Sequence, residues 1–371
     1  MGAAGIILAD GKLGEIDELI RHRTVASVPF GGRYRLVDFA LSNFVNADVM
    51  QVGIITKRNY QSLMDHIGSG KDWDLSRKNG GVIIFPPYGN PFANYQNSHG
   101  NLLEALQSVD EFITNCPEDH IIVTECDSVN VIDYSDVLSQ HEDTNADITV
   151  VYKELDGTVT EKGSLACDTD EFGRLVSGSI VRGDKGLIKA SIGAYVIKRK
   201  LLAALLKEAA SRGSHSFEQD LIINNISSLR IFGYNYAGAY LPINSMEEYY
   251  KYNMALLDEN MRSQVFEQAP IYTKVRDSAP TKYGRGAKVQ NSFIADGCEI
   301  EGTVVNSILF RGVKVSKGTV IKDSILMQDT MVMENVKLKA VITDKNVTIK
   351  ERQQLSGCEK LPYYIAKNMV V

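Results

Sequence analysis

A glycine turn followed by two arginines is the first part of the chain whose residue types suit a ligand. The turn is 29–32, Arg33 and Arg35 follow it, and an amphipathic run over 36–45 predicts a helix. Glycines let a backbone approach a ligand closely, and the N-terminus of a helix favours an anion. The pattern predicts either an anion-binding turn or a simple turn into a core helix.

The residues between the first predicted strand and this turn stand where a phosphate loop would be expected. They begin with Asp10, Gly11, Lys12 and Leu13, and Glu15 follows. A triphosphate is bound by backbone N–H groups and by cations. This loop carries two carboxylates and keeps only Lys12 as a cation, so we expect it to repel a triphosphate.

Length and composition restrict the class of protein. The chain has 371 residues, of which 44% are hydrophobic, and a formal net charge of −6. It can bury one large core and a second, smaller domain. The negative charge argues against a nucleic-acid partner, and no apolar run reaches the roughly 18 residues that cross a membrane. Five scattered cysteines and the lack of a signal-peptide pattern predict a cytoplasmic protein with reduced thiols.

Up to residue 262, short apolar runs alternate with helical patterns. This alternation predicts an α/β domain with a mixed, mainly parallel sheet. The predicted strands are 3–9, 49–56, 82–85, 120–124, 148–152, 194–197 and 231–236, and the predicted helices are 59–66, 102–113, 135–141, 200–210 and 217–226. A further helix is expected to begin with a capping box at Ser245.

Residues 263–286 have little periodicity and are predicted to link this domain, 1–262, to a second domain, 287–371. In the second domain apolar residues recur at intervals of six, with breaks in phase: Ile294, Ile300, Val315, Ile321, Met327, Met333, Val341 and Val347. A hexapeptide period is typical of a parallel β-helix, in which one residue in six points into a shared core. A β-sandwich is the alternative architecture.

The segment 28–43 closely resembles VPFGGKYRLIDFPLSN of the bacterial ADP-glucose pyrophosphorylases, or glucose-1-phosphate adenylyltransferases. The resemblance covers nearly the whole chain. Enzymes of this family make ADP-glucose for glycogen from ATP and glucose 1-phosphate. The resemblance implies a Rossmann-like nucleotidyltransferase domain followed by a left-handed parallel β-helix.

The family residues that contact ATP are altered here. The family loop reads AGGxGxRL; its first glycine corresponds to Asp10, its third to Leu13 and its arginine to Glu15, whereas the second survives as Gly11. The lysine of the RAKP segment corresponds to Val25. The resemblance therefore implies an ATP loop that has lost glycines and cations.

The metal-binding residues are also incomplete. The family holds its metal with an aspartate in GDHIYKMDY and a second in WRDVGT. The first is kept as Asp127, with Asp133 and Tyr134 at the matching spacing, but the second motif reads YLPINS and places Pro242 at the aspartate position. Because proline has no ligating side chain, the resemblance implies that no two-carboxylate magnesium site forms. We expect no required cofactor, and magnesium only if residual activity exists.

The glucose 1-phosphate site is kept in part. The SxGxY strand is present at 191–195, and a version of DFGKDIIP at 216–222. The EKP lysine has no counterpart in 175–182, and the GTADA helix start becomes Gly100, Asn101 and two leucines. Residues that the resemblance marks as remnants of substrate binding are Gly11, Lys12, Arg33, Gly100, Gly193 and Tyr195.

Positions that build the fold are thus kept, and positions that touch phosphate are lost. The resemblance then implies a GlgD-type regulatory subunit, non-catalytic or impaired, in a cytoplasmic hetero- or homo-oligomer, expected to be a tetramer. It would activate a catalytic ADP-glucose pyrophosphorylase subunit.

Three alternatives stay open. The chain would be an active adenylyltransferase if it used Asp127, Lys12 and Arg33. A regulatory sugar phosphate would bind the vacated cleft if Arg33, Arg35, Lys57 and Arg58 converged there. Acyl transfer on the coil is disfavoured, because no histidine lies beyond the linker.

Overall fold

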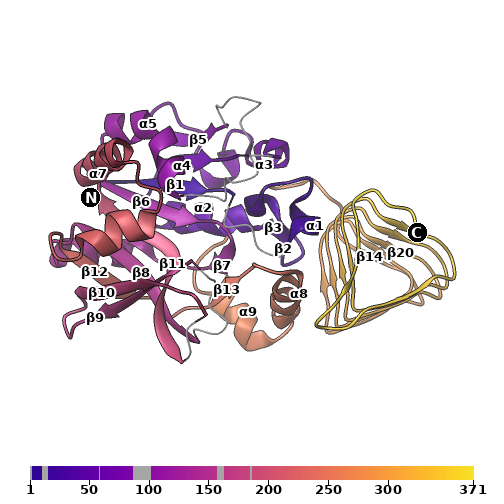
Figure 1. The fold of residues 1–371 in the computed structure, drawn as a ribbon. Coiled ribbons are helices and arrows are strands. Elements are labelled where there is room, and N and C mark those ends of the chain that lie inside the picture. Colours follow the sequence, from indigo (N-terminus) through magenta and orange to yellow (C-terminus); the bar gives the residue numbers. More distant parts are fainter. Residues whose placement is uncertain (1, 11–15, 58, 87–101, 157–162, 184–185) are drawn as a thin grey trace.

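The computed structural model describes residues 2–10, 16–57, 59–86, 102–156, 163–183 and 186–371. An α/β domain precedes a three-sided coil that packs beside it (Figure 1). The large sheet has the order β10-β9-β11-β6-β1-β4-β5, and β8 joins β11 to β12. Its strands are β1 Ala3–Leu8, β4 Gln51–Ile55, β5 Gly81–Phe85, β6 His120–Glu125, β8 Ile148–Asp156, β9 Leu165–Thr169, β10 Leu175–Ile180, β11 Leu187–Lys198 and β12 Ile231–Asn235.

Helices cover both faces of this sheet. They are α1 Asp17–Ile20, α2 Leu36–Asn46, α3 Gln61–Ile67, α4 Leu102–Ser108, α5 Asp110–Asn115, α6 Tyr134–Asp143, α7 Arg199–Arg212, α8 Met246–Ala255 and α9 Glu259–Phe266. Side chains of β1 alternate between the two faces: Ile7 packs in one cluster with Phe39 of α2, and Ile6 packs in the other with Leu103 of α4 and Leu206 of α7. Neighbouring pairs β4–β1 and β1–β6 are parallel, which confirms the mainly parallel core.

The sequence missed the antiparallel elements and some helix boundaries. Strands β9 and β10 pair antiparallel, and so do the short strands β7 (Ser128–Asn130) and β13 (Tyr240–Pro242). The predicted helix 102–113 is broken at Val109 into α4 and α5, although its apolar face is buried as expected. The predicted helix 217–226 is a π-helix, Phe217–Ile222, followed by a 3-10 turn, Ile223–Asn225.

Three parallel sheets form the sides of the coil, as expected for a left-handed β-helix. The first side contains β14 Lys282–Tyr283, β17 Glu299–Ile300, β20 Lys314–Val315, β23 Met331–Val332 and β26 Thr348–Ile349. The second contains β15 Lys288–Gln290, β18 Thr303–Val305, β21 Val320–Lys322, β24 Lys337–Lys339 and β27 Gln354–Ser356. The third contains β16 Phe293–Ile294, β19 Ile308–Leu309, β22 Ile325–Leu326, β25 Val341–Thr343 and β28 Tyr363–Ile365. Helix α9 and strand β14 both extend into the segment 263–286 that the sequence predicted as a linker.

The phase of the predicted coil core is wrong at two positions, Met327 and Met333. Lys314 pairs with Met331 and Val320 with Lys337, so these turns of the coil take seventeen residues rather than three hexapeptides. The missing residue moves the inward positions from Met327 to Leu326 and from Met333 to Val332. Val332 is 1% exposed, whereas Met333 is 39% exposed and Met327 packs in the cluster of the α/β domain.

This phase makes a prediction from two matched substitutions. Met327 is fully buried against the α/β domain, where it joins the cluster that contains Phe39. We expect Met327→Ala to lower the free energy of unfolding by about 2–5 kcal/mol, because a cavity remains, and Met333→Ala to change it by less than about 0.5 kcal/mol. Urea denaturation of both variants measures this; equal losses would contradict the burial of Met327 against the α/β domain and the exposure of Met333.

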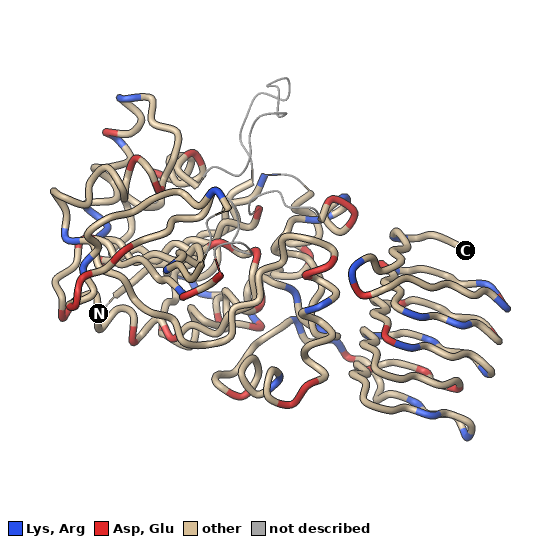
Figure 2. Tube along the Cα trace, turned by 60° about the horizontal axis from the view of Figure 1, so that its bottom comes forward, with Lys and Arg blue, Asp and Glu red and all other residues tan. Residues whose placement is uncertain are grey.

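The two parts of the chain carry opposite net charge. Residues 1–266 contain 24 Lys and Arg against 35 Asp and Glu, whereas residues 267–371 contain 16 against 11. Basic residues recur along the coil in Figure 2. Opposite net charges favour the association of the two parts. Apolar side chains of the coil, such as Phe310 and Ile325, complete the contact by joining the α/β core.

Candidate functional site

The carboxyl ends of β1, β4 and β6 place three charged residues at one edge of the sheet. Because these strands are parallel neighbours, Asp10 after β1, Lys57 after β4 and Asp127 after β6 lie at the same edge. The carboxylate of Asp10 accepts a hydrogen bond from the backbone N–H of Lys57. Ligands of open α/β sheets bind at such an edge, so this is the candidate nucleotide site.

Beside Asp127, the position of a second metal carboxylate is occupied by proline. Strand β13 pairs antiparallel with β7, with Pro242 opposite Ser128, the residue after Asp127. The backbone N–H of Ile243 donates to the carbonyl of Asp127 at 2.8 Å. Within the described ranges, no three His, Cys, Asp or Glu side chains are grouped so that they would hold a metal ion. Pro242 therefore supplies no second carboxylate beside Asp127.

Several predicted site residues fall elsewhere. Gly11, Lys12, Leu13, Glu15 and Gly100 lie outside the described residues.

Val25 is a core residue, 2% exposed, in the 3-10 turn Val25–Ser27. Arg33 is exposed, with its guanidinium 5.6 Å from the centre of the Tyr34 ring. The turn that holds Val25 lies beside the end of β1, because the backbone N–H of Ala26 donates to the carbonyl of Ala9 at 3.0 Å.

The glycine turn packs against helix α8. It joins β2 (Pro29–Phe30) to β3 (Tyr34–Arg35), and Gly31 and Gly32 take the positive φ angles of +60° and +84°. The backbone N–H of Gly31 donates to Asn253 Oδ1 at 3.0 Å. An added Cβ at Gly31 would lie 3.3 Å from Leu256. The turn therefore serves the packing of α2 on α8, which is the simpler of the two predictions.

The SxGxY strand forms a buried polar site on β11. The Ser191 hydroxyl donates to Tyr195 Oη at 3.1 Å, and the backbone N–H of Gly193 donates to Ser191 Oγ at 3.2 Å. The register of β11 shifts between Ser191 and Ala194, so a bulge aims these groups at one point. The ring of Tyr195 packs edge-on to Phe217, 4.9 Å between centres.

Two glutamates that the sequence did not single out flank this site. Glu125, at the end of β6, is 8% exposed, and Glu218 in the π-helix is 9% exposed. Burial, followed by the charges of Glu218 and Glu125, raises the pKa of Tyr195 well above its usual value. One signal was available: Glu218 replaces the glycine of the family's DFGKDIIP.

Little space is left between these side chains. The cavity at the site measures about 10 Å³, room for at most one water molecule. Its lining is Glu125, Ser164, Leu165, Ser191, Ile192, Gly193, Tyr195 and Tyr240. A larger cavity of about 290 Å³ is lined by residues of β8, β9, β10 and β11, and none of its described lining residues is a predicted site residue.

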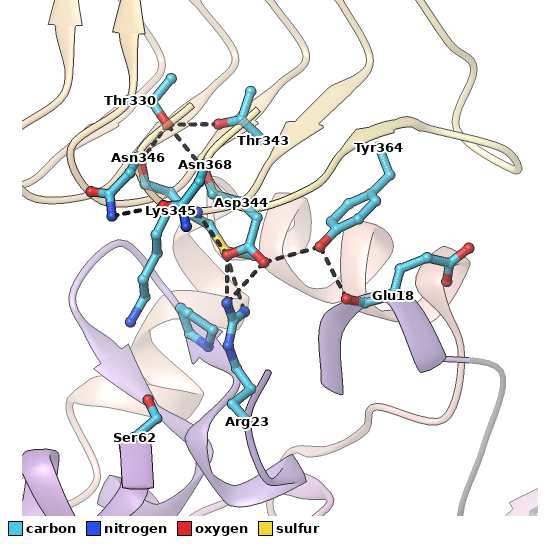
Figure 3. A network of polar contacts seen from close by, with 12 residues as sticks. Glu18, Arg23, Ser62, Thr330, Thr343, Asp344, Lys345, Asn346, Tyr364 and Asn368 are labelled. Atoms are coloured by element: carbon cyan, nitrogen blue, oxygen red, sulfur yellow. Dashed lines mark hydrogen bonds and ion pairs between the residues drawn. The ribbon is translucent and has the colours of Figure 1, made fainter. Parts of the chain in front are cut away.

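A buried ion pair joins the α/β domain to the coil (Figure 3). The Arg23 guanidinium donates to both carboxylate oxygens of Asp344, at 2.5 and 2.8 Å, and the two side chains are 2% and 1% exposed. The Tyr364 hydroxyl donates to Asp344 at 3.0 Å and lies 3.1 Å from the backbone carbonyl of Glu18. This network fixes the coil against the residues that follow the phosphate loop.

Two more cations lie near this ion pair. Arg35 donates to the carbonyl and hydroxyl of Ser62 at 2.6 and 3.0 Å, and burial lowers its pKa to about 10. Lys345 extends from the coil toward the α/β domain in Figure 3, and burial together with Arg35 and Arg23 lowers its pKa to about 6. Arg35 thus joins the interdomain cluster, not Lys57 beside Asp10, and Arg58 lies outside the described residues.

The lowered pKa of Lys345 predicts that the stability of the fold depends on pH. Between pH 6 and its ordinary pKa the unfolded chain binds a proton that the folded chain does not, so stability rises with pH in this window, by at most about 1.4 kcal/mol per unit. We expect Lys345→Met to be more stable than the unmodified chain at pH 7, with the difference shrinking toward pH 10. Denaturant titrations across this range test it; a difference independent of pH would contradict the prediction.

Comparisons with known proteins agree with the two-part fold. Residues 4–162 match the nucleotidyl transferase family model, and residues 277–359 match the GlmU-like C-terminal hexapeptide model. The chain is 34% identical over 356 residues to a glycogen biosynthesis protein GlgD of Bacillus subtilis, covering 96% of this chain and 93% of the relative. It is 35% identical to a GlgD protein of Geobacillus stearothermophilus, covering 85% and 82%. A glucose-1-phosphate adenylyltransferase of the same organism is 31% identical, covering 85% and 82%.

No helix in the described parts of the chain is long and apolar enough to cross a membrane.

Proposed function

This chain belongs to the family that includes the GlgD proteins and the glucose-1-phosphate adenylyltransferases, and we propose that it is a regulatory subunit of ADP-glucose pyrophosphorylase. In this proposal it takes part in glycogen biosynthesis in the cytoplasm, requires no cofactor, and catalyses little or no adenylyl transfer itself. It assembles with a catalytic subunit, as a tetramer, and raises the activity of that subunit.

The observation that carries this proposal is Pro242 beside Asp127. Adenylyl transfer needs a metal ion that neutralises phosphate charge while the attacking oxygen is aligned. A single carboxylate next to a proline supplies half of the ligands that the family's two aspartates provide. Asp10 adds a negative charge at the same edge, where a triphosphate requires positive charge.

The partner in this proposal is supported by the relatives. Geobacillus stearothermophilus has both a GlgD protein and a glucose-1-phosphate adenylyltransferase among them, so both types of chain occur in one organism. A fold kept over both domains, with an altered nucleotide edge, is what a subunit needs if it contacts a related catalytic chain. Size-exclusion chromatography of this chain with such an adenylyltransferase tests assembly; separate elution of the two chains would count against it.

ATP binding tests the proposal that this chain catalyses little or no adenylyl transfer. Calorimetric titration with ATP, with and without magnesium, is expected to give no saturable magnesium-dependent heat. Binding that needs magnesium and is weakened by Asp127→Asn would contradict the proposal.

A second candidate function is glucose-1-phosphate adenylyltransferase activity, which converts ATP and glucose 1-phosphate to ADP-glucose and diphosphate. Asp127 favours it, because this aspartate is kept at the end of β6, and the adenylyltransferase relatives are about as similar to the chain as the GlgD relatives. The same titration separates the two, because only the active enzyme requires the magnesium complex of ATP.

A further inference from the structure

The SxGxY strand, which the resemblance assigns to the glucose 1-phosphate site, is covered by side chains of this chain. Ser191, Tyr195 and the bulge at Gly193 present hydroxyl and backbone groups toward one point. The space in front of them is about 10 Å³, too small for a hexose ring. The side chains that occupy this space determine whether a ligand can bind here.

Glu125 comes from β6 and lies over the bulge of β11. A Cβ atom added at Gly193 would lie 2.5 Å from Oε2 of Glu125, and 3.1 Å from its Cβ, so the whole side chain covers the backbone of Gly193. The positive φ of Gly193, +72°, keeps this position free of a side chain of its own. Glu125 is thereby pressed onto the part of the strand that a ligand would contact.

Glu218 lies near Tyr195, although it is not one of the residues that line the cavity. It lies in the π-helix one residue after Phe217, whose ring packs on Tyr195 at 4.9 Å, and its carboxylate is 3.4 Å from the Ser216 hydroxyl. Glu218 and Glu125 are both less than a tenth exposed and both act on the Tyr195 hydroxyl. Two buried carboxylates thus lie near the Tyr195 hydroxyl.

We propose that Glu125 and Glu218 form a carboxylate plug that excludes glucose 1-phosphate from this pocket. The Glu125 side chain lines the cavity and occupies volume that the sugar needs, and the charges of both glutamates oppose the phosphate. This inference rests on the proposed function and deepens it: the chain is a subunit whose sugar pocket is closed by its own residues. Removal of the two side chains should reopen the pocket.

The test is binding of glucose 1-phosphate to the full chain, measured by ligand-observed NMR. We expect Glu125→Ala/Glu218→Ala to bind at least about tenfold more tightly than the unmodified chain, a change of about 1.4 kcal/mol. Glu125→Gln/Glu218→Gln removes the charges but keeps the volume, and is expected to gain less than the alanine variant. Glu171→Ala removes one exposed carboxylate outside the pocket and is expected to change nothing.

Three results would overturn the plug: tight binding by the unmodified chain, no gain in the folded alanine variant, or an equal gain in the glutamine variant. If the double variant is unstable by thermal denaturation, Glu125→Ala alone provides the same comparison. Failure of the proposed function is seen separately, as diphosphate release by the unmodified chain. The alanine variant should bind sugar phosphate and still release no diphosphate, because Pro242 is unchanged.

Discussion

Purified alone, the chain is expected to release diphosphate from ATP and glucose 1-phosphate at least about 10³-fold more slowly than a glucose-1-phosphate adenylyltransferase relative. Loss of one preorganised group that stabilises the transition state lowers a rate by about 10²–10³. Here one metal carboxylate is replaced by Pro242, Asp10 adds negative charge, and Glu125 closes the sugar pocket. Such losses within one site are not additive, so the combined reduction in rate is not the product of the single reductions.

A coupled assay of diphosphate, with both proteins at equal concentration, measures this difference. Pro242→Asp is the control variant. It restores one carboxylate but leaves the other two changes in place, so it should remain within about tenfold of the unmodified chain. A rate for the unmodified chain within tenfold of the relative would contradict the account.

Replacement of Asp344 by alanine is expected to lower the free energy of unfolding by about 3–5 kcal/mol. The substitution leaves the Arg23 guanidinium, 2% exposed, without its carboxylate, and removes the acceptor of the Tyr364 hydroxyl. Because the ion pair joins residues of both domains, we also expect the coil and the α/β domain to unfold in separate transitions. Urea denaturation followed by far-UV circular dichroism measures both effects.

Two controls separate this loss from a general effect of removing charge. Arg23→Met/Asp344→Leu removes both charges and should be much less destabilising than Asp344→Ala, because no buried charge is left unpaired. Glu208→Ala breaks the exposed pair with Arg212 and should change stability by less than about 1 kcal/mol. A loss for Asp344→Ala no larger than that for Glu208→Ala would show that the interdomain ion pair contributes little.

Much of the fold could be predicted from apolar periodicity, because long runs of buried residues repeat at helix or strand intervals. The parallel strands and the coil follow directly from these runs. The positions of Met327 and Met333 were wrong because the turns from Lys314 to Met331 and from Val320 to Lys337 take seventeen residues. One residue is omitted between Ile321 and Leu326, near Asp323, which takes a positive φ angle. A count of six along the chain cannot register this omission.

Short antiparallel elements lacked such a signal. Strand β13 has only three residues and ends in Pro242, which cannot donate a ladder hydrogen bond, so its pattern gave no strand. At Ser245 the predicted helix start is present: Ser245 Oγ accepts from the N–H of Glu248 at 3.1 Å. The Glu248 carboxylate accepts from the backbone N–H of Asn244 at 2.9 Å and also interacts with the backbone N–H of Ser245.

The candidate site could be predicted from the sequence only where the type of a single residue determines which chemistry is possible. Pro242 in place of an aspartate could be interpreted from the sequence, because proline cannot bind a metal. The closure of the pocket by Glu125, and the pairing of Arg23 with Asp344, 321 positions apart, depend on how distant segments pack. The chain contains many acidic residues, and no local sequence pattern distinguishes Glu125 and Asp344 from the others.

The central claim is that this chain regulates a catalytic partner without catalysing the reaction itself. The most direct measurement is the rate of ADP-glucose formation by the assembly of this chain with an adenylyltransferase relative, with the metal-binding aspartate changed to asparagine in one subunit at a time. The account predicts that Asp127→Asn in this chain changes the rate by less than about twofold, whereas the corresponding change in the partner lowers it at least about 10²-fold. An assembly that stays active with the altered partner, and loses that activity with Asp127→Asn, would contradict it.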